Sequence, residues 1–202
     1  TPGQPTHRVL DSSEMEPVYE SYKQTLQILS YRKNSNSRRA SWVLKCPSHL
    51  PHLTLLKKLF PEARFVWTHR SMDKVIASFC ALSQVFATSS LPALTPATMG
   101  RHMMNYYTEL VSKGMAQRES LDNNEYGNDA SLFVDVAFDD LVSDPIGQVR
   151  CIYDQLGLEW SETFENSVKA YLEEDSKERE ALNKERDVNY RKPSLEDFAI
   201  EP

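Results

Sequence analysis

Apolar residues recur along this chain in two spacings, which alternate from one end to the other. Steps of three and four residues place apolar side chains on one face of a helix, and they predict helices at 14–31, 52–60, 71–82, 98–118, 146–156 and 159–174. Short apolar runs predict strands at 42–44, 65–68 and 131–138. Strands that alternate with helices build a parallel sheet with helices on its faces. The pattern therefore predicts an α/β fold.

Polar and charged stretches separate these elements. Turn-forming residues predict loops at 1–13, 32–41, 84–97 and 121–130. Residues 175–187 carry a dense run of both charges, which is typical of a solvated helix face or of a mobile loop.

Chemistry-bearing residues gather in the segment 42–82. Its strands at 42–44 and 65–68 are joined by a helix that Pro61 ends, so they predict a βαβ unit. Open parallel sheets bind ligands beyond the carboxyl ends of their strands. At those ends lie Lys45, Ser48, His49, His69 and Arg70. We therefore expect a binding site at this edge of the sheet.

Arg70 stands where the second strand passes into a helix, and Ser78 follows eight positions later. A guanidinium beside a helix N-terminus is suited to binding a phosphate. This pair resembles the cofactor-binding motif of the PAPS-dependent sulfotransferases, which move a sulfuryl group from 3'-phosphoadenosine-5'-phosphosulfate (PAPS) to a hydroxyl or amine. The loop Lys45-Cys46-Pro47-Ser48-His49-Leu50-Pro51 resembles the lysine-then-histidine loop of the same family.

The resemblance implies a P-loop NTPase-like three-layer sandwich with a parallel β-sheet flanked by helices. It implies that PAPS is the co-substrate and that no metal is required. By the same resemblance, Arg70 and Ser78 hold the 3'-phosphate of the cofactor. His49 is then the catalytic base, and Lys45 stabilises charge on the bridging oxygen as the bond to sulfur breaks.

The downstream strand and helix also resemble the family, with two departures from its pattern. Family members often close a basic loop over the 3'-phosphate, and Arg191 and Lys192 are the candidates here, although the usual glycines are missing nearby. Family members also often carry a tyrosine where Phe138 stands, so one hydrogen bond near the adenine is lost.

The glycine-containing loop that cradles the 5'-phosphosulfate in the family has no counterpart in this sequence. The chain has six glycines, and none lies in a phosphate-cradle context after a strand. We therefore expect residues 1–202 to form a single, N-terminally incomplete domain, a C-terminal portion whose first strand and phosphate loop lie upstream of Thr1.

Composition narrows the class of protein. The chain has 202 residues, of which 40% are apolar and 26% charged, and its net charge of -6 argues against a nucleic-acid binder. Three widely spaced cysteines and no membrane-spanning apolar run predict a cytoplasmic protein with reduced thiols. We expect the binding partner to be a small-molecule or glycan acceptor. The sequence gives no evident sign of a membrane partner, and it leaves open whether the chain forms a homo-oligomer.

Each candidate residue also has a structural interpretation. Arg70 would form an ion pair with Asp73 or Asp139, and Ser78 would be a buried serine bonded to its own backbone. Lys45 would be a surface lysine at a strand end, His49 a residue at the start of a helix, and His52 a helix-surface residue. Two other functions remain open: another P-loop enzyme, such as a nucleotide kinase, and a non-catalytic binding module.

Overall fold

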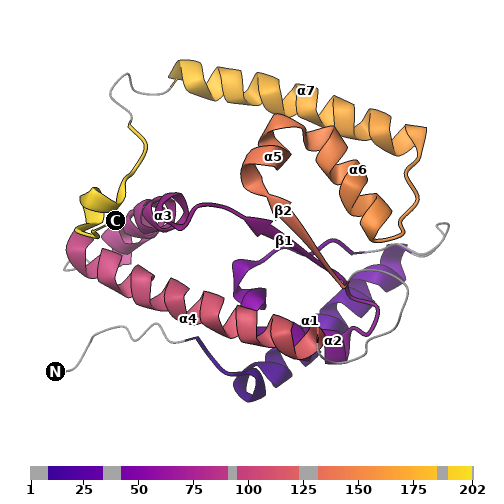
Figure 1. Cartoon of the computed structure of the whole chain (residues 1–202), viewed down its shortest axis with the longest axis horizontal. Coiled ribbons are helices and arrows are strands. Elements are labelled where there is room, and N and C mark those ends of the chain that lie inside the picture. Colours follow the sequence, from indigo (N-terminus) through magenta and orange to yellow (C-terminus); the bar gives the residue numbers. More distant parts are fainter. Residues whose placement is uncertain (1–8, 34–41, 91–94, 123–131, 186–190, 202) are drawn as a thin grey trace. The chain divides into compact units, whose positions relative to one another are not determined.

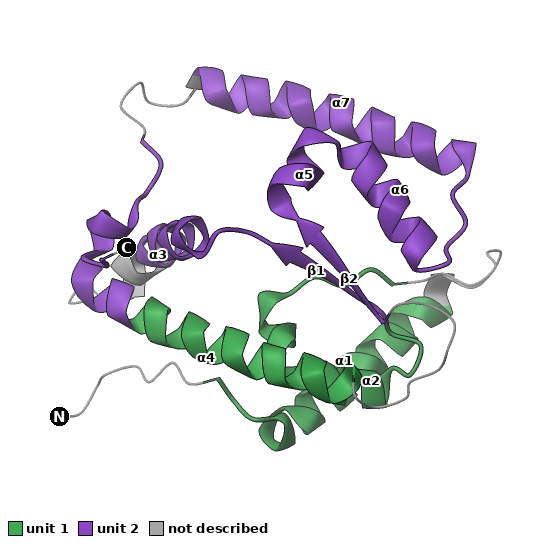
Figure 2. Cartoon of the chain, in the orientation of Figure 1, with its two compact units in different colours: residues 1–63, 102–126 green, residues 64–101, 127–202 purple. Residues whose placement is uncertain are grey.

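The computed structural model describes residues 9–33, 42–90, 95–122, 132–185 and 191–201 (Figure 1). Two compact units divide the chain (Figure 2). The first unit contains residues 1–63 and 102–126, and the second contains residues 64–101 and 127–202.

The described residues form a mostly helical α/β structure with a small parallel sheet. The α-helices are α1 (Ser12–Lys33), α2 (Leu53–Leu59), α3 (Met72–Ser90), α4 (Pro96–Asp122), α5 (Phe138–Ser143), α6 (Pro145–Gln155) and α7 (Glu162–Glu185). Two short 3₁₀ helices are η1 (Pro47–His52) and η2 (Leu195–Phe198). The strands are β1 (Phe65–His69) and β2 (Phe133–Ala137).

Strands β1 and β2 pair in parallel within the second unit. Phe65 lies opposite Phe133, and His69 lies opposite Ala137. On β2, Val134 and Val136 are almost fully buried and pack with Leu156, which follows α6. This packing holds α5 and α6 against the sheet and confirms the parallel pairing that the sequence predicts.

The strand predicted at 42–44 is not formed, and this prediction was wrong. Residues 42–46 belong to no strand, and the side chain of Val43 is 94% exposed. The indole N–H of Trp42 instead donates a hydrogen bond of 2.9 Å to the Ser30 hydroxyl of α1. A short apolar run becomes a strand only where a neighbouring strand satisfies its backbone groups. Among the described residues the sheet thus has two strands. The predicted three-layer sandwich, a parallel sheet flanked by helices, is therefore seen only in part.

The other predicted helices and strands are present with different lengths, whereas the loop at 84–97 and the stretch that forms α5 differ in kind. The loop predicted at 84–97 is largely helical where it is described, since α3 continues to Ser90 and α4 begins at Pro96. Proline is tolerated in the first turn of a helix, so Pro96 starts α4 rather than breaking it. The charged run from 175 continues α7 as a solvated helix face, with an Arg179–Asp175 ion pair of 2.7 Å. Most of each loop predicted at 1–13, 32–41 and 121–130 lies outside the described residues, and the described ends of these ranges include the first and last residues of α1 and the last residues of α4.

In the first unit, a glycine lets η1 pack closely against α4. A Cβ atom built on Gly114 would lie so close to the Leu50 side chain that the two would overlap sterically. Leu50 directly follows His49, so this close packing supports the loop that carries the predicted base.

We predict that Gly114→Ala destabilises the protein, although alanine favours a helix by about 1 kcal/mol over glycine. The added methyl group overpacks the contact with Leu50, which costs about 1–3 kcal/mol, so the net effect is a loss. Urea denaturation measures it. The exposed neighbour Met115→Ala is the control and should change the free energy of unfolding by less than about 0.5 kcal/mol. An equally stable Gly114→Ala protein would contradict the packing.

Candidate active site

Arg70 lies at the carboxyl end of β1 and contacts the residue that follows β2. Its guanidinium carbon is 4.3 Å from the centre of the Phe138 ring, a cation–π contact. Within the described chain, Arg70 pairs with neither Asp73 nor Asp139, and Asp73 accepts a hydrogen bond from the Ser71 hydroxyl. A stacked guanidinium keeps its N–H groups directed outward in its plane. The side chain is exposed, contacts the ring, and has N–H donors for an anion.

Ser78 lies on α3, in the same unit as Arg70. Its side chain is exposed, so the interpretation of a buried helix serine was wrong. The structure places the two residues on consecutive elements, Arg70 before α3 and Ser78 within it.

A histidine–aspartate pair on the sheet was not predicted from the sequence. His69 Nε2 lies 2.6 Å from Asp135 Oδ1, and the His69 ring stacks on Trp67 with the ring centres 5.7 Å apart. The register explains the pair, because residues 67 and 69 of β1 and residue 135 of β2 share one face of the sheet. The signal available in the sequence was the lone aspartate between valines in β2.

His49 lies in η1 of the first unit, and Lys45, four residues earlier in the chain, is exposed. The backbone N–H of His49 donates to the Cys46 carbonyl at 3.1 Å, as expected for a tight turn. Its ring Nδ1 shares a hydrogen bond of 2.8 Å with the hydroxyl of Tyr19, a buried residue of α1. Burial lowers the pKa of the His49 imidazole. The hydrogen bond thus holds the His49 ring at Nδ1, and burial favours the neutral form of the imidazole.

His52 was predicted to be a helix-surface residue, and this prediction was wrong. Its side chain is 3% exposed, and Nδ1 lies 3.5 Å from the Ser12 hydroxyl. Burial is the main cause that lowers the pKa of His52, and the charges of Lys113 and His49 lower it further against the opposing effect of Asp11. The helical periodicity could not show this, because residues of η1 and α1 together bury the ring.

Arg191 and Lys192 precede η2 in the second unit, and both are exposed. The Arg191 guanidinium forms an ion pair with Asp197, which also accepts hydrogen bonds from Ser194. The Ser194 backbone hydrogen bond, followed by the one from Arg191, lowers the pKa of the Asp197 carboxyl. The contact of these two basic residues with a cofactor remains a prediction.

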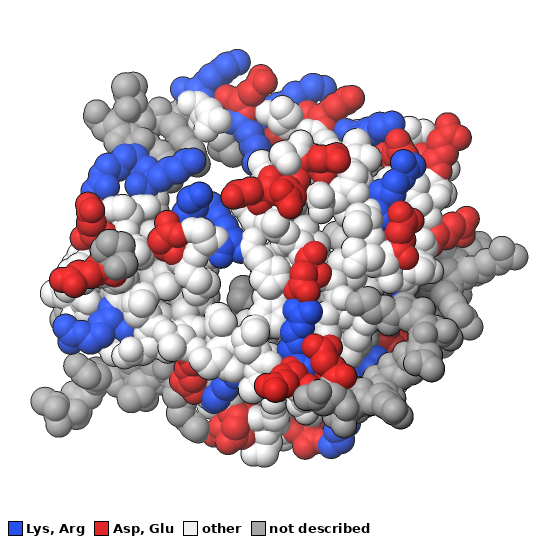
Figure 3. Space-filling view, in the orientation of Figure 1, with Lys and Arg blue, Asp and Glu red and all other residues white. Residues whose placement is uncertain are grey.

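The predicted site residues divide between the two units. Lys45 and His49 belong to the first unit, and the four proposed phosphate ligands belong to the second (Figure 2). On the face drawn in Figure 3, basic and acidic side chains are interspersed.

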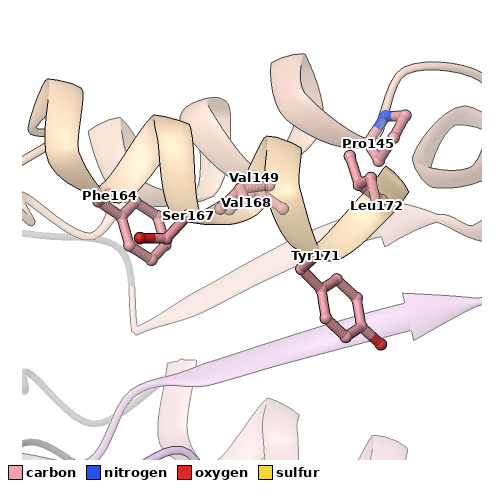
Figure 4. A pocket seen from close by; sticks show the side chains of 7 residues that line it. All are labelled: Pro145, Val149, Phe164, Ser167, Val168, Tyr171 and Leu172. Atoms are coloured by element: carbon pink, nitrogen blue, oxygen red, sulfur yellow. The ribbon is translucent and has the colours of Figure 1, made fainter. Parts of the chain in front are cut away.

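A separate apolar groove lies between α6 and α7 (Figure 4). Its volume is about 410 Å³, and its lining residues are Pro145, Val149, Phe164, Ser167, Val168, Tyr171 and Leu172. None of the predicted site residues lines it.

Residues 2–162 match the pattern of the sulfotransferase family. The chain belongs to the sulfotransferase family. It is 28% identical to the omega-hydroxy-beta-dihydromenaquinone-9 sulfotransferase Stf3 of Mycobacterium bovis and Mycobacterium tuberculosis over 136 residues, which are 67% of this chain and 33% of each relative. This sulfotransferase chain therefore spans about a third of the length of these relatives.

Two solved structures show the sulfotransferase fold. The sulfotransferase STF9 from Mycobacterium avium matches with a TM-score of 0.68 at 27% identity, over 79% of this chain and 38% of that chain. STF1 from Mycobacterium tuberculosis H37Rv matches with a TM-score of 0.58 at 29% identity, over 79% and 36%. Among the described helices of this sulfotransferase, none is both long and apolar enough to span a bilayer.

We predict that this sulfotransferase loses stability as the pH falls below about 6.5, the ordinary pKa of histidine. The pKa values of His49 and His52 are lowered in the folded state. The unfolded state therefore binds more protons between 6.5 and the lowered values, so stability falls with pH in that window. Urea midpoints at pH 7.5 and pH 5.5 measure the slope. His52→Gln should reduce it, and a wild-type slope of opposite sign would contradict the assignment.

Proposed function

We propose that this sulfotransferase transfers a sulfuryl group from PAPS to a hydroxyl or amine acceptor. Family membership supports the reaction class and the donor. The observation that carries the assignment of residues is the Arg70–Phe138 contact at the carboxyl edge of the sheet. It places a guanidinium at the carboxyl end of a parallel strand, where open sheets bind their ligands.

In this proposal Arg70 and Ser78 hold the 3'-phosphate of the donor. The Phe138 ring engages one face of the guanidinium and leaves the donors in its plane for phosphate oxygens, which accept charge-assisted hydrogen bonds. The exposed Ser78 hydroxyl adds a donor from α3. Arg191 is the less suited candidate of the C-terminal pair, because binding would compete with Asp197, whereas Lys192 is exposed.

His49 and Lys45 carry the chemistry. The acceptor oxygen or nitrogen forms a bond to sulfur while the bond from sulfur to the bridging phosphate oxygen breaks, and adenosine 3',5'-bisphosphate leaves. The proton of the acceptor passes to the imidazole of His49, whose neutral form is favoured by burial. The Lys45 ammonium stabilises the negative charge that develops on the bridging oxygen.

A hydroxyl is the favoured acceptor within this proposal. The matched relatives are named for an omega-hydroxy substrate, which supports an alcohol over an amine. A small-molecule or glycan alcohol therefore remains the proposed acceptor class.

We predict that Arg70→Ala weakens binding of adenosine 3',5'-bisphosphate by about tenfold to a hundredfold, because hydrogen bonds to charged groups contribute about 1.5–3 kcal/mol. Calorimetry or thermal shift on the 202-residue chain measures the affinity. Adenosine 5'-monophosphate, which lacks the 3'-phosphate, is the control ligand, and its binding should not change. Equal losses for both nucleotides would remove Arg70 from the 3'-phosphate. A preference for magnesium-ATP over the bisphosphate would favour the kinase alternative.

We predict that Phe138→Leu weakens binding of the same bisphosphate and that Phe138→Tyr preserves it, since only an aromatic ring supports the guanidinium. A cation–π contact at an exposed site contributes about 0.5–1 kcal/mol, so the expected loss is about twofold to fivefold. Phe164→Leu is the matched control, because Phe164 stacks on Tyr153 with ring centres 4.7 Å apart and is remote in sequence from Arg70. Identical affinity in Phe138→Leu and wild type would show that the ring does not orient Arg70.

We predict that His49→Ala abolishes sulfuryl transfer, in a form of the protein that turns over, and leaves the bisphosphate bound. A base takes up the acceptor's proton and does not act on the nucleotide. The substitution should therefore abolish kcat and leave the affinity for the bisphosphate unchanged. Retained turnover would assign the base to another residue.

A further inference from the structure

Four rings form a cluster around His49 in the first unit. Helix α1 supplies Tyr19 and Tyr22, three residues apart and so on one face, and η1 supplies His49 and His52. The Tyr19 ring centre lies 5.6 Å from that of His49, 5.8 Å from that of His52 and 6.5 Å from that of Tyr22. Tyr19 is therefore the centre of the cluster, and it is 3% exposed.

One contact within this cluster joins polar atoms at hydrogen-bond distance. The Tyr19 hydroxyl and His49 Nδ1 are 2.8 Å apart. Tyr22 is comparably close to His49, with ring centres 6.1 Å apart, but it contributes ring packing alone. The hydrogen bond engages Nδ1 and leaves Nε2 as the second nitrogen of the imidazole.

We propose that Tyr19 is the positioning residue of the catalytic histidine. Its phenol oxygen accepts a hydrogen bond from Nδ1–H of His49, so that Nε2 keeps the lone pair that takes the acceptor's proton. The inference rests on the proposed function, in which His49 is the base.

The choice of nitrogen decides whether His49 can act. A neutral imidazole carries one N–H, and the hydrogen bond made by one nitrogen determines which tautomer is present. Free histidine in water favours the tautomer protonated on Nε2, in which that nitrogen cannot accept a proton. An oxygen acceptor at Nδ1 reverses this preference. The same Nδ1–H bond persists when Nε2 becomes protonated, so the proton transfer needs no reorganisation of the pair.

A phenol suits this role because it orients the ring without adding charge. Burial is the main cause that raises the pKa of Tyr19, with smaller effects of Cys46 and Tyr22. The phenol therefore stays neutral at physiological pH. A carboxylate in its place would favour the charged imidazolium, which has no lone pair to offer. The structure contains the contrasting arrangement in His69, whose partner is the carboxylate of Asp135.

The tautomer can be read directly by ¹⁵N NMR of the histidine side chains in the 202-residue chain, above the pKa of His49. His49→Gln identifies the signals. We expect wild-type His49 to show the pyridine-like nitrogen signal at Nε2 and the N–H signal at Nδ1. A pyridine-like signal at Nδ1 would overturn the proposal, because Tyr19 would then be the donor. This measurement needs no Tyr19 variant, so a folding defect in a variant cannot leave the question open.

Two variants separate positioning from packing. Tyr19→Phe keeps the ring and removes the oxygen, and we expect the pyridine-like signal to move to Nδ1. Tyr22→Phe is the matched control and should leave the tautomer of His49 unchanged. An unchanged tautomer in a folded Tyr19→Phe protein would also overturn the proposal. Binding of adenosine 3',5'-bisphosphate is the independent test of the donor site: if it binds through Arg70 while His49 is protonated on Nε2, the inference about Tyr19 fails and the cofactor assignment stands.

Discussion

The parallel pairing of β1 with β2 is the constraint on which the candidate cofactor site depends. Because both strands run in one direction, their carboxyl ends reach the same edge of the sheet. The register that sets His69 opposite Ala137 also brings the next residues, Arg70 and Phe138, into contact. These two residues are 68 positions apart, since 138 minus 70 is 68, and only the strand pairing joins them. The buried valines of β2 fix this pairing by packing with Leu156.

Around His49, burial is the constraint on which the proposed base depends. The loop that carries this histidine is a 3₁₀ helix that packs Leu50 against Gly114, and Tyr19 reaches the imidazole from α1. Desolvation favours the neutral imidazole, and a neutral phenol does not reverse that effect. His49 and His69 thus differ in the kind of partner: His49 pairs with a phenol and His69 with a carboxylate.

The family match and the local geometry carry different parts of the functional conclusion. Residues 2–162 match the sulfotransferase pattern, which gives the class of protein. The roles of individual residues rest on their surroundings: Arg70 is stacked and exposed, whereas Arg191 is paired with Asp197. Sequence resemblance treated these two arginines alike, and the structure gives them different partners.

The sequence by itself determined most of the helices, the strand at 65–68, the strand within 131–138 and the candidate motif of Arg70 and Ser78. Local spacing and turn residues suffice for these, because helix faces and strand ends depend on near neighbours along the chain. Tertiary structure decided what depends on distant partners. Trp42 to Leu44 has a strand-like composition but forms no strand, His52 has a helix-surface position but is buried, and the partners of His49, His69 and Arg70 come from other elements. Hydrogen-bond ladders and burial are properties of pairs of segments, and no single segment of sequence contains them.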